Sequence, residues 1–266
     1  MHEIDILGVP VTCFTLYREA VAHVVDRVKT RDKSCCVAIN PLKVWSAVKD
    51  PSFAEVLKAA DVHICDGIGV ALAVRLLRGR SIQRITGVQL FFHLVAAAEK
   101  EGLSIFLLGA TAESNEDACH NLLKRHPRLK IAGRHDGYFD GDEAMMDAIN
   151  AVEPDILFVA MGSPKQEYWM AKNCAGLRAP FVMGVGGTFD VVSGSAKWAP
   201  ALFRKTGTEF VYRLCMQPRR LKIVPTLCRF TVAVIKAYIH LRLSDGESGN
   251  GEGAQPDASD SPGRMD

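Results

Sequence analysis

The sequence predicts an α/β protein with a Rossmann-like, mainly parallel sheet and helices on both faces, followed by a basic helical C-terminal appendage. Three observations predict this. Short β-rich runs alternate with helical stretches of about 10–15 residues through most of residues 1–196. The strand runs are apolar without a period of two, as in strands buried on both faces. The composition changes sharply after residue 196.

The expected helices and strands follow from the positions of turn-forming residues such as Gly and Pro and from the spacing of apolar residues. Gly8 and Pro10 interrupt the apolar run 4–11, which indicates an edge hairpin. Thr15 can cap a helix that runs to about Thr30, because an apolar stripe repeats every four residues there. The other strands are expected at residues 35–39, 62–65, 104–108, 129–133, 156–160 and 181–185, with helices at 42–48, 52–60, about 68–77, 88–100, 115–125, 143–152 and 167–174.

Asp66 is the first candidate site residue. It follows the strand run 62–65 and precedes two glycines, Gly67 and Gly69. In a parallel sheet this loop lies in the crevice where ligands bind, so the carboxylate is placed to do chemistry. The alternative is that Asp66 caps the next helix.

Two more polar loops are expected at the same sheet edge. Residues 161–166 open a helix and offer backbone N–H groups together with Lys165 and Gln166, which suits a phosphate or a sugar hydroxyl. An ordinary Ser-Pro helix start is the alternative. The loop 184–190 allows close backbone approach to a ligand, and its candidate binding residues are Gly186, Gly187 and Asp190.

Two nucleotide-binding motifs are incomplete or absent. The pair Gly67 and Gly69 lacks the third glycine of G-x-G-x-x-G, and no G-x-x-x-x-G-K-[ST] occurs. A P-loop kinase or ATPase is therefore disfavoured. A nicotinamide-dependent, Rossmann-like oxidoreductase stays open as an alternative function.

The net charge of +2 hides a basic segment and an acidic tail. Residues 197–242 contain ten basic residues and one acidic residue, whereas residues 243–266 contain one basic and six acidic. The tail is rich in Gly, Ser and Asp, so we expect it to be disordered. The domains are therefore expected at 1–196, 197–242 and 243–266.

A helical wheel of residues 219–242 gathers Lys222, Arg229, Lys236 and His240 on one face, with long aliphatic side chains elsewhere. This pattern indicates an interfacial helix on an anionic membrane surface. A basic helix packed on its own domain is the alternative, and a non-catalytic membrane adaptor follows from the helix alone. Pro225 is expected to break the run. Nucleic acid is disfavoured because stacking aromatics do not accompany the basic residues.

The eight cysteines form no C-x-x-C pair, so we expect reduced thiols in a cytoplasmic protein and no metal site. The N-terminus lacks the layout of a signal peptide, and no uncharged run reaches the ~18 residues of a membrane span. The expected location is therefore the cytoplasm, with peripheral association at the inner face of the cell membrane.

Several motifs together resemble the WecG/TagA/CpsF family of bacterial glycosyltransferases, in the right order between about residues 4 and 225. The matching stretches are Asn40-Pro41, Asp66-Gly67, Arg84-x-Thr86-Gly87, Leu108-Gly109, Gly137-Tyr138-Phe139, Gly162-x-Pro164-Lys165-Gln166-Glu167, Gly184-Val185-Gly186-Gly187-x-Phe189-Asp190, Ala199-Pro200, and Tyr212-Arg213-Leu214 with Pro218-x-Arg220.

The resemblance implies a metal-independent, inverting transfer of a sugar from a UDP-sugar to a polyprenyl-diphosphate-linked sugar, with no cofactor. It also implies site residues. Asp66 matches the general base, while Asn40, Arg84 and Gln166 match residues that line the pocket. Arg213 and Arg220 match arginines that hold the lipid diphosphate, and Lys222 can replace a third basic position. Homo-oligomers stay open.

Overall fold

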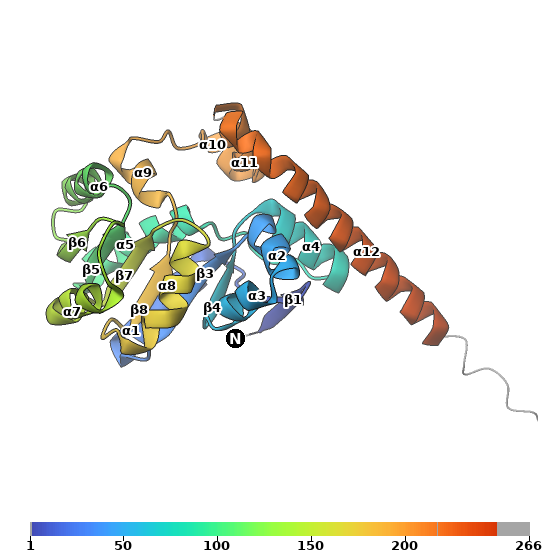
Figure 1. Ribbon diagram of the computed structural model, residues 1–266, viewed down its shortest axis with the longest axis horizontal. Helices are drawn as coiled ribbons and strands as arrows, with labels where there is room; N and C mark the ends of the chain where they lie inside the picture. The colour runs from blue at the N-terminus through green and yellow to red at the C-terminus, as the bar shows by residue number, and fades with distance from the viewer. Residues whose placement is uncertain (1, 217, 249–266) are drawn as a thin grey trace, which may run out of the picture.

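The computed structural model describes residues 2–216 and 218–248, and its centre is a six-stranded parallel sheet (Figure 1). The strand order is β4-β3-β8-β7-β5-β6, which confirms the expected fold class. The strands are β3 (Ser34–Ile39), β4 (Val62–Cys65), β5 (Ser104–Gly109), β6 (Lys130–His135), β7 (Ile156–Ala160) and β8 (Phe181–Gly184).

The N-terminal hairpin forms as expected, outside the main sheet. Its antiparallel strands are β1 (Glu3–Ile6) and β2 (Val9–Thr12). The first helix, α1 (Tyr17–Thr30), is also present, but Thr15 does not cap it. The carboxylate of Glu19 instead accepts hydrogen bonds from the backbone N–H groups of Thr15 and Leu16, because a first-turn acid can satisfy donors at the helix start.

Helices cover both faces of the sheet and enclose two hydrophobic cores. The unalternated strand runs explain this, since Cys35, Val37 and Ile39 of β3 enter one core while Cys36 and Ala38 enter the other. The second of these cores contains residues of α1, α5 (Gly87–Glu101), α6 (Ala112–Arg125) and α9 (Thr188–Ser193). The first contains residues of α2 (Pro41–Lys49), α3 (Pro51–Lys58), α4 (Ile68–Arg78), α7 (Asp142–Val152) and α8 (Lys165–Asn173).

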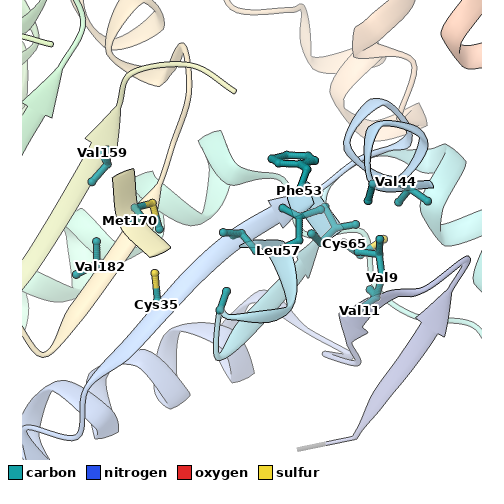
Figure 2. Close-up of a cluster of buried hydrophobic side chains, with 14 of the residues drawn as sticks. Val9, Val11, Cys35, Val44, Phe53, Leu57, Cys65, Val159, Met170 and Val182 are labelled. Carbon is teal, nitrogen blue, oxygen red and sulfur yellow. The ribbon is translucent and has the colours of Figure 1, made fainter. Parts of the chain in front are cut away.

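Figure 2 shows part of the core that includes Cys35. Phe53 and Leu57 of α3 lie beside Cys65 of β4, and Val9 and Val11 of β2 complete this end of the cluster (Figure 2). The packing fixes the strand that leads to Asp66, because each of these side chains is at most 3% exposed.

The C-terminal segment is helical, and it runs along the side of the molecule where α2 and α4 lie (Figure 1). It consists of α10 (Ala201–Thr206), α11 (Glu209–Met216), the 3₁₀ helix η2 (Pro218–Ile223) and α12 (Val224–Ser248). The expected break near Pro225 is confirmed, since η2 ends at Ile223 and the proline lies in the first turn of α12, where its missing N–H is tolerated.

The helix α12 packs against α2 and α4 and then extends past the core as a rod (Figure 1). Phe230 and Val234 anchor it, with 4% and 6% of their surfaces exposed. The helix continues to Ser248, past residue 243 where the tail was expected to begin. Residues 249–266 of that tail lie outside the described residues.

One part of the C-terminal segment bears on the expectation about membranes. The stretch Arg220–Leu243 has 24 residues and a mean hydropathy of 1.3, with 11% of it buried, so by length and composition alone it could cross a membrane. The sequence argument considered only uncharged runs. Isolated charges such as Arg229 and Lys236 break such a run without making the stretch polar overall.

Candidate active site

The three polar loops singled out from the sequence do lie at one edge, because all six strands run parallel. Of the three, only the loop with Asp66 lines the main cavity described below. β4 stands at the end of the sheet and β7 is three strands away, about 14 Å at the usual strand spacing. The loop that holds Asp66 is therefore separate from the loop that holds Gln166.

A cavity of about 520 Å³ lies at the end of β4, within the size range of small-molecule sites. Its walls come from the loop after β3 with the start of α2, from α4, and from the helices α11, η2 and α12. Its charged and amide side chains are Asn40, Asp66, Arg84, Glu209 and Arg220. The cavity thus brings together four residues that the sequence predicted.

Asp66 lies where the sequence placed it, just beyond β4, and its backbone N–H donates to the carbonyl of Ile39 at 2.8 Å. The N-cap of α4 is Gly67, with a φ of 116°, so Asp66 does not occupy that capping position. A Cβ on Gly87 would stand 3.9 Å from Oδ2 of Asp66. The carboxylate therefore lies beside the first turn of α5, whose dipole favours negative charge.

Asn40 has a structural duty as well as a place in the cavity. Its Oδ1 accepts from the backbone N–H groups of Leu42 at 3.1 Å and Lys43 at 3.0 Å, which caps α2. The side-chain amide nitrogen is the part of Asn40 that can donate to a ligand. The sequence showed the cap position before Pro41 but not this division of roles.

Arg84 ties the C-terminal segment to the core. Its guanidinium donates to the backbone carbonyl of Arg204 and to Oε1 of Glu209, the latter at 3.4 Å. A second cavity, of about 560 Å³, lies against Arg84 and is lined also by Tyr17, Gln89 and Lys205. Arg84 therefore lines both cavities and connects α10 and α11 to the core.

Tyr17 is a residue that the sequence analysis missed. Its hydroxyl accepts a hydrogen bond from the backbone N–H of Thr86 at 2.9 Å. Burial is the main reason that the pKa of Tyr17 is raised, and the nearby Asp66 carboxylate adds a smaller effect in the same direction. The phenol therefore stays protonated near neutral pH. No local motif marks Tyr17, because its partner is 69 positions away.

Gln166 is buried outside the main cavity. Its Oε1 accepts from the backbone N–H of Gly186 at 3.0 Å, and its Nε2 donates to Oε1 of Glu167 at 2.7 Å. The same Glu167 oxygen lies 2.8 Å from Nζ of Lys43. Gln166 thus joins the loops after β7 and β8, and in this structure it positions backbone rather than lining the cavity.

The other predicted binding residues of these two loops also lie away from the cavity. Lys165 donates to the carbonyl of Gly137 at 2.9 Å. The backbone carbonyl of Asp190 accepts a hydrogen bond from the backbone N–H of Ala196 at 2.8 Å. The side-chain Oδ2 of Asp190 would stand 3.5 Å from a Cβ on Gly187. Gly186 has a φ of 54°, a conformation that suits glycine.

The basic C-terminal residues differ in position. Arg220 lines the cavity. Lys222 is exposed and does not line it. Arg213 lies in α11, but its side chain is outside the described part of the chain. Within residues 2–216 and 218–248, no group of three or more His, Cys, Asp or Glu side chains could hold a metal ion.

The fold and the cavity define a class of protein: an α/β protein with a cavity that combines a carboxylate and arginines with an apolar wall. The sequence model of the glycosyl transferase WecG/TagA/CpsF family matches residues 4–244. The chain belongs to this family.

Curated relatives from two genera are similar over most of the chain. One from Bacillus subtilis is 31% identical over 236 residues, which covers 89% of this chain and 90% of the relative. One from Staphylococcus aureus is 33% identical over 242 residues, which covers 88% and 93%. Both are named N-acetylglucosaminyldiphosphoundecaprenol N-acetyl-beta-D-mannosaminyltransferase. The family confirms the resemblance and argues against the oxidoreductase alternative.

Proposed function

We propose that this chain transfers a hexose or N-acetylhexosamine, of the N-acetylmannosamine type or glucose, from a UDP-sugar to a sugar on a polyprenyl diphosphate. The product would serve cell-surface polysaccharide or teichoic acid synthesis. The observation that carries the proposal is the position of Asp66 in a cavity that also contains Arg84 and Arg220. The names of the relatives support a lipid-linked acceptor.

In the proposed step Asp66 is the general base. Its carboxylate takes the proton from the acceptor hydroxyl while that oxygen attacks the anomeric carbon. The new glycosidic bond forms as the bond to the UDP oxygen breaks, so the configuration inverts and UDP leaves with the electron pair.

No metal or other cofactor takes part in this proposal. Charge on the two diphosphates must then be met by protein groups, and arginines bind such oxygens in pairs. Arg220 is the described arginine best placed for the lipid diphosphate, because it lines the cavity and comes from the C-terminal segment. Arg213 and Lys222 would assist from the same segment.

The first test is UDP release from a panel of UDP-sugars in EDTA, with and without a lipid-diphosphate-sugar acceptor. Acceptor-dependent release from one donor supports the proposal and identifies the sugar. If every donor and acceptor pair fails, the proposal is rejected and the membrane-adaptor alternative gains weight.

The Asp66→Asn variant tests the base directly. The amide keeps the size of the side chain but cannot take the proton, so turnover should fall by about 100-fold or more. UDP binding, measured by calorimetry, should stay within a factor of a few. Near-normal turnover in a folded Asp66→Asn variant would remove Asp66 from the mechanism.

A further inference from the structure

The cavity next to Asp66 changes chemistry along its length. One end holds the carboxylates and arginines of the site, including Asp66 and Arg220. The rest is walled almost entirely by aliphatic and aromatic side chains from two helices. Those of α4 are Ile68, Leu72, Ala73 and Leu76, and those of α12 are Leu227, Phe230, Val234 and Ile235.

Both walls adjoin the polar end. α4 starts beside Asp66 at Ile68, and α12 follows Arg220 and η2 in the chain, so each wall is joined to a residue of the polar part. Phe230 of α12 packs against the first turn of α4, since one of its ring carbons would stand 3.6 Å from a Cβ on Gly69. The walls therefore form one channel, which we call the α4–α12 channel.

Several side chains of this channel face solvent. Leu72 is 57% exposed, Leu76 41% and Ile235 46%. Contiguous exposed apolar surface marks a site for an apolar partner. Because the channel is continuous with the catalytic cavity, its occupant must extend from the reacting group.

We propose that the α4–α12 channel binds the first part of the hydrocarbon chain of the lipid-linked acceptor. The inference rests on the proposed function and adds a binding site to it. Arg220 lines the same cavity and comes from η2, directly before the α12 wall, so it can bind the diphosphate that joins the sugar of such a lipid to its chain. Head group, diphosphate and hydrocarbon thus each meet a matching surface.

The channel can hold only the start of a polyprenyl chain. From Leu227 to Ile235 its α12 wall spans eight residue steps, about 12 Å of helix. The remainder of the chain leaves the channel beyond Ile235, the last α12 residue that lines it. This part of the polyprenyl chain would lie in the bilayer.

The test compares two water-soluble acceptors that carry the same sugar diphosphate, one on a methyl group and one on a farnesyl group, without membranes or detergent. If the channel binds hydrocarbon, kcat/KM for the farnesyl acceptor should exceed that for the methyl acceptor by at least tenfold. In the double variant Leu76→Asp/Ile235→Asp this ratio should fall to within a factor of about three of unity.

The matched control is Val232→Asp/Ile239→Asp. These residues are each 51% exposed on α12 but do not line the channel. This variant adds the same charge and should keep the preference for farnesyl.

A methyl acceptor that works as well as the farnesyl acceptor overturns the channel and leaves the proposed function standing. Equal loss of preference in both double variants also overturns it, because α12 would then act as an unspecific apolar surface, for a bilayer or a second copy of the chain. Failure of both acceptors with every donor overturns the proposed function and the channel together.

Discussion

The ammonium of Lys43 lies 2.8 Å from Oε1 of Glu167, and the two side chains are 6% and 0% exposed. Lys43 belongs to α2, three residues after Asn40, and Glu167 follows Gln166 in α8. Nζ of Lys43 also donates to the carbonyl of Ala38 at 2.7 Å. This buried pair therefore fixes the loop after β3, which lines the cavity, relative to the loop after β7, which does not.

Removing one member of this ion pair should lower the free energy of unfolding substantially. In Lys43→Met the Glu167 carboxylate stays buried beside Gln166 without its cation, and such losses typically cost about 3–5 kcal/mol. We expect the free energy of unfolding in urea to fall by that order. The control is Lys58→Met, because Lys58 pairs with Glu55 at 2.9 Å on the surface, where pairs are worth about 0.5 kcal/mol. Equal losses in the two variants would contradict a structural role for the buried pair.

Much of this fold follows from local signals in the sequence. Strands such as β7 were expected at their observed bounds, because buried parallel strands are short apolar runs closed by turn residues. The order β4-β3-β8-β7-β5-β6 could not be predicted in this way. It depends on how helices pack across the two faces, and no single stretch encodes that packing.

The site was predictable in part. Asp66 was found because a strand, a carboxylate and two glycines are adjacent in the chain. The pairing of Arg84 with Glu209 could not be found in this way, because the two residues are 125 positions apart in the chain. Gln166 shows a third case: its residue type suits a ligand, but Gly186 and Glu167 satisfy its amide in the folded chain. Such assignments need tertiary contacts.

The Arg84–Glu209 pair predicts that the C-terminal segment can be loosened without touching Asp66. The two side chains are 16% and 12% exposed, and a charged hydrogen bond in such a place contributes about 1.5–3 kcal/mol. Glu209→Gln should therefore raise KM for the lipid-linked acceptor about tenfold or more and speed proteolysis within residues 197–216.

Arg178–Glu153 supplies the control for this experiment, since that pair is exposed and lies at the end of α7. Glu153→Gln should change neither KM nor the rate of proteolysis. If Glu209→Gln lowers kcat but leaves KM and proteolysis unchanged, the pair acts on the chemical step and does not hold the segment.

Thiol reactivity should report the packing next to Asp66. Burial raises the pKa of Cys65 to about 12, and burial likewise raises that of Cys36 to about 12. At pH 8 only about one thiol in ten thousand would then be the reactive thiolate. Iodoacetamide should modify the exposed Cys215 and Cys228 first, as mass spectrometry of the peptides can show.

Raising the pH toward 12 should increase labelling of these buried thiols, because more of each thiol is then deprotonated. The comparison is valid only up to the pH at which the protein unfolds. In urea at pH 8 all eight cysteines should react. Fast labelling of Cys65 in the native protein at pH 8 would mean that the end of β4 opens readily.

Membrane attachment should be peripheral, although Arg220–Leu243 has the length and composition of a span. Arg229, Lys236 and His240 are all exposed on α12, while Phe230 and Val234 bind the helix to the core. A helix held in this way can lie on an anionic surface, where each basic residue contributes about 1 kcal/mol. The protein should sediment with anionic vesicles at low salt and be released at about 1 M salt, where the screening length is only ~3 Å.

Charge reversal separates this attachment from insertion. Arg229→Glu/Lys236→Glu should weaken vesicle binding by at least about tenfold. Lys100→Glu/Lys124→Glu makes the same change in net charge on exposed residues of α5 and α6 and should have little effect. If the wild-type protein stays with the vesicles through high salt and alkaline carbonate, α12 inserts across the bilayer, and the apolar stretch outweighs its contacts with α2 and α4.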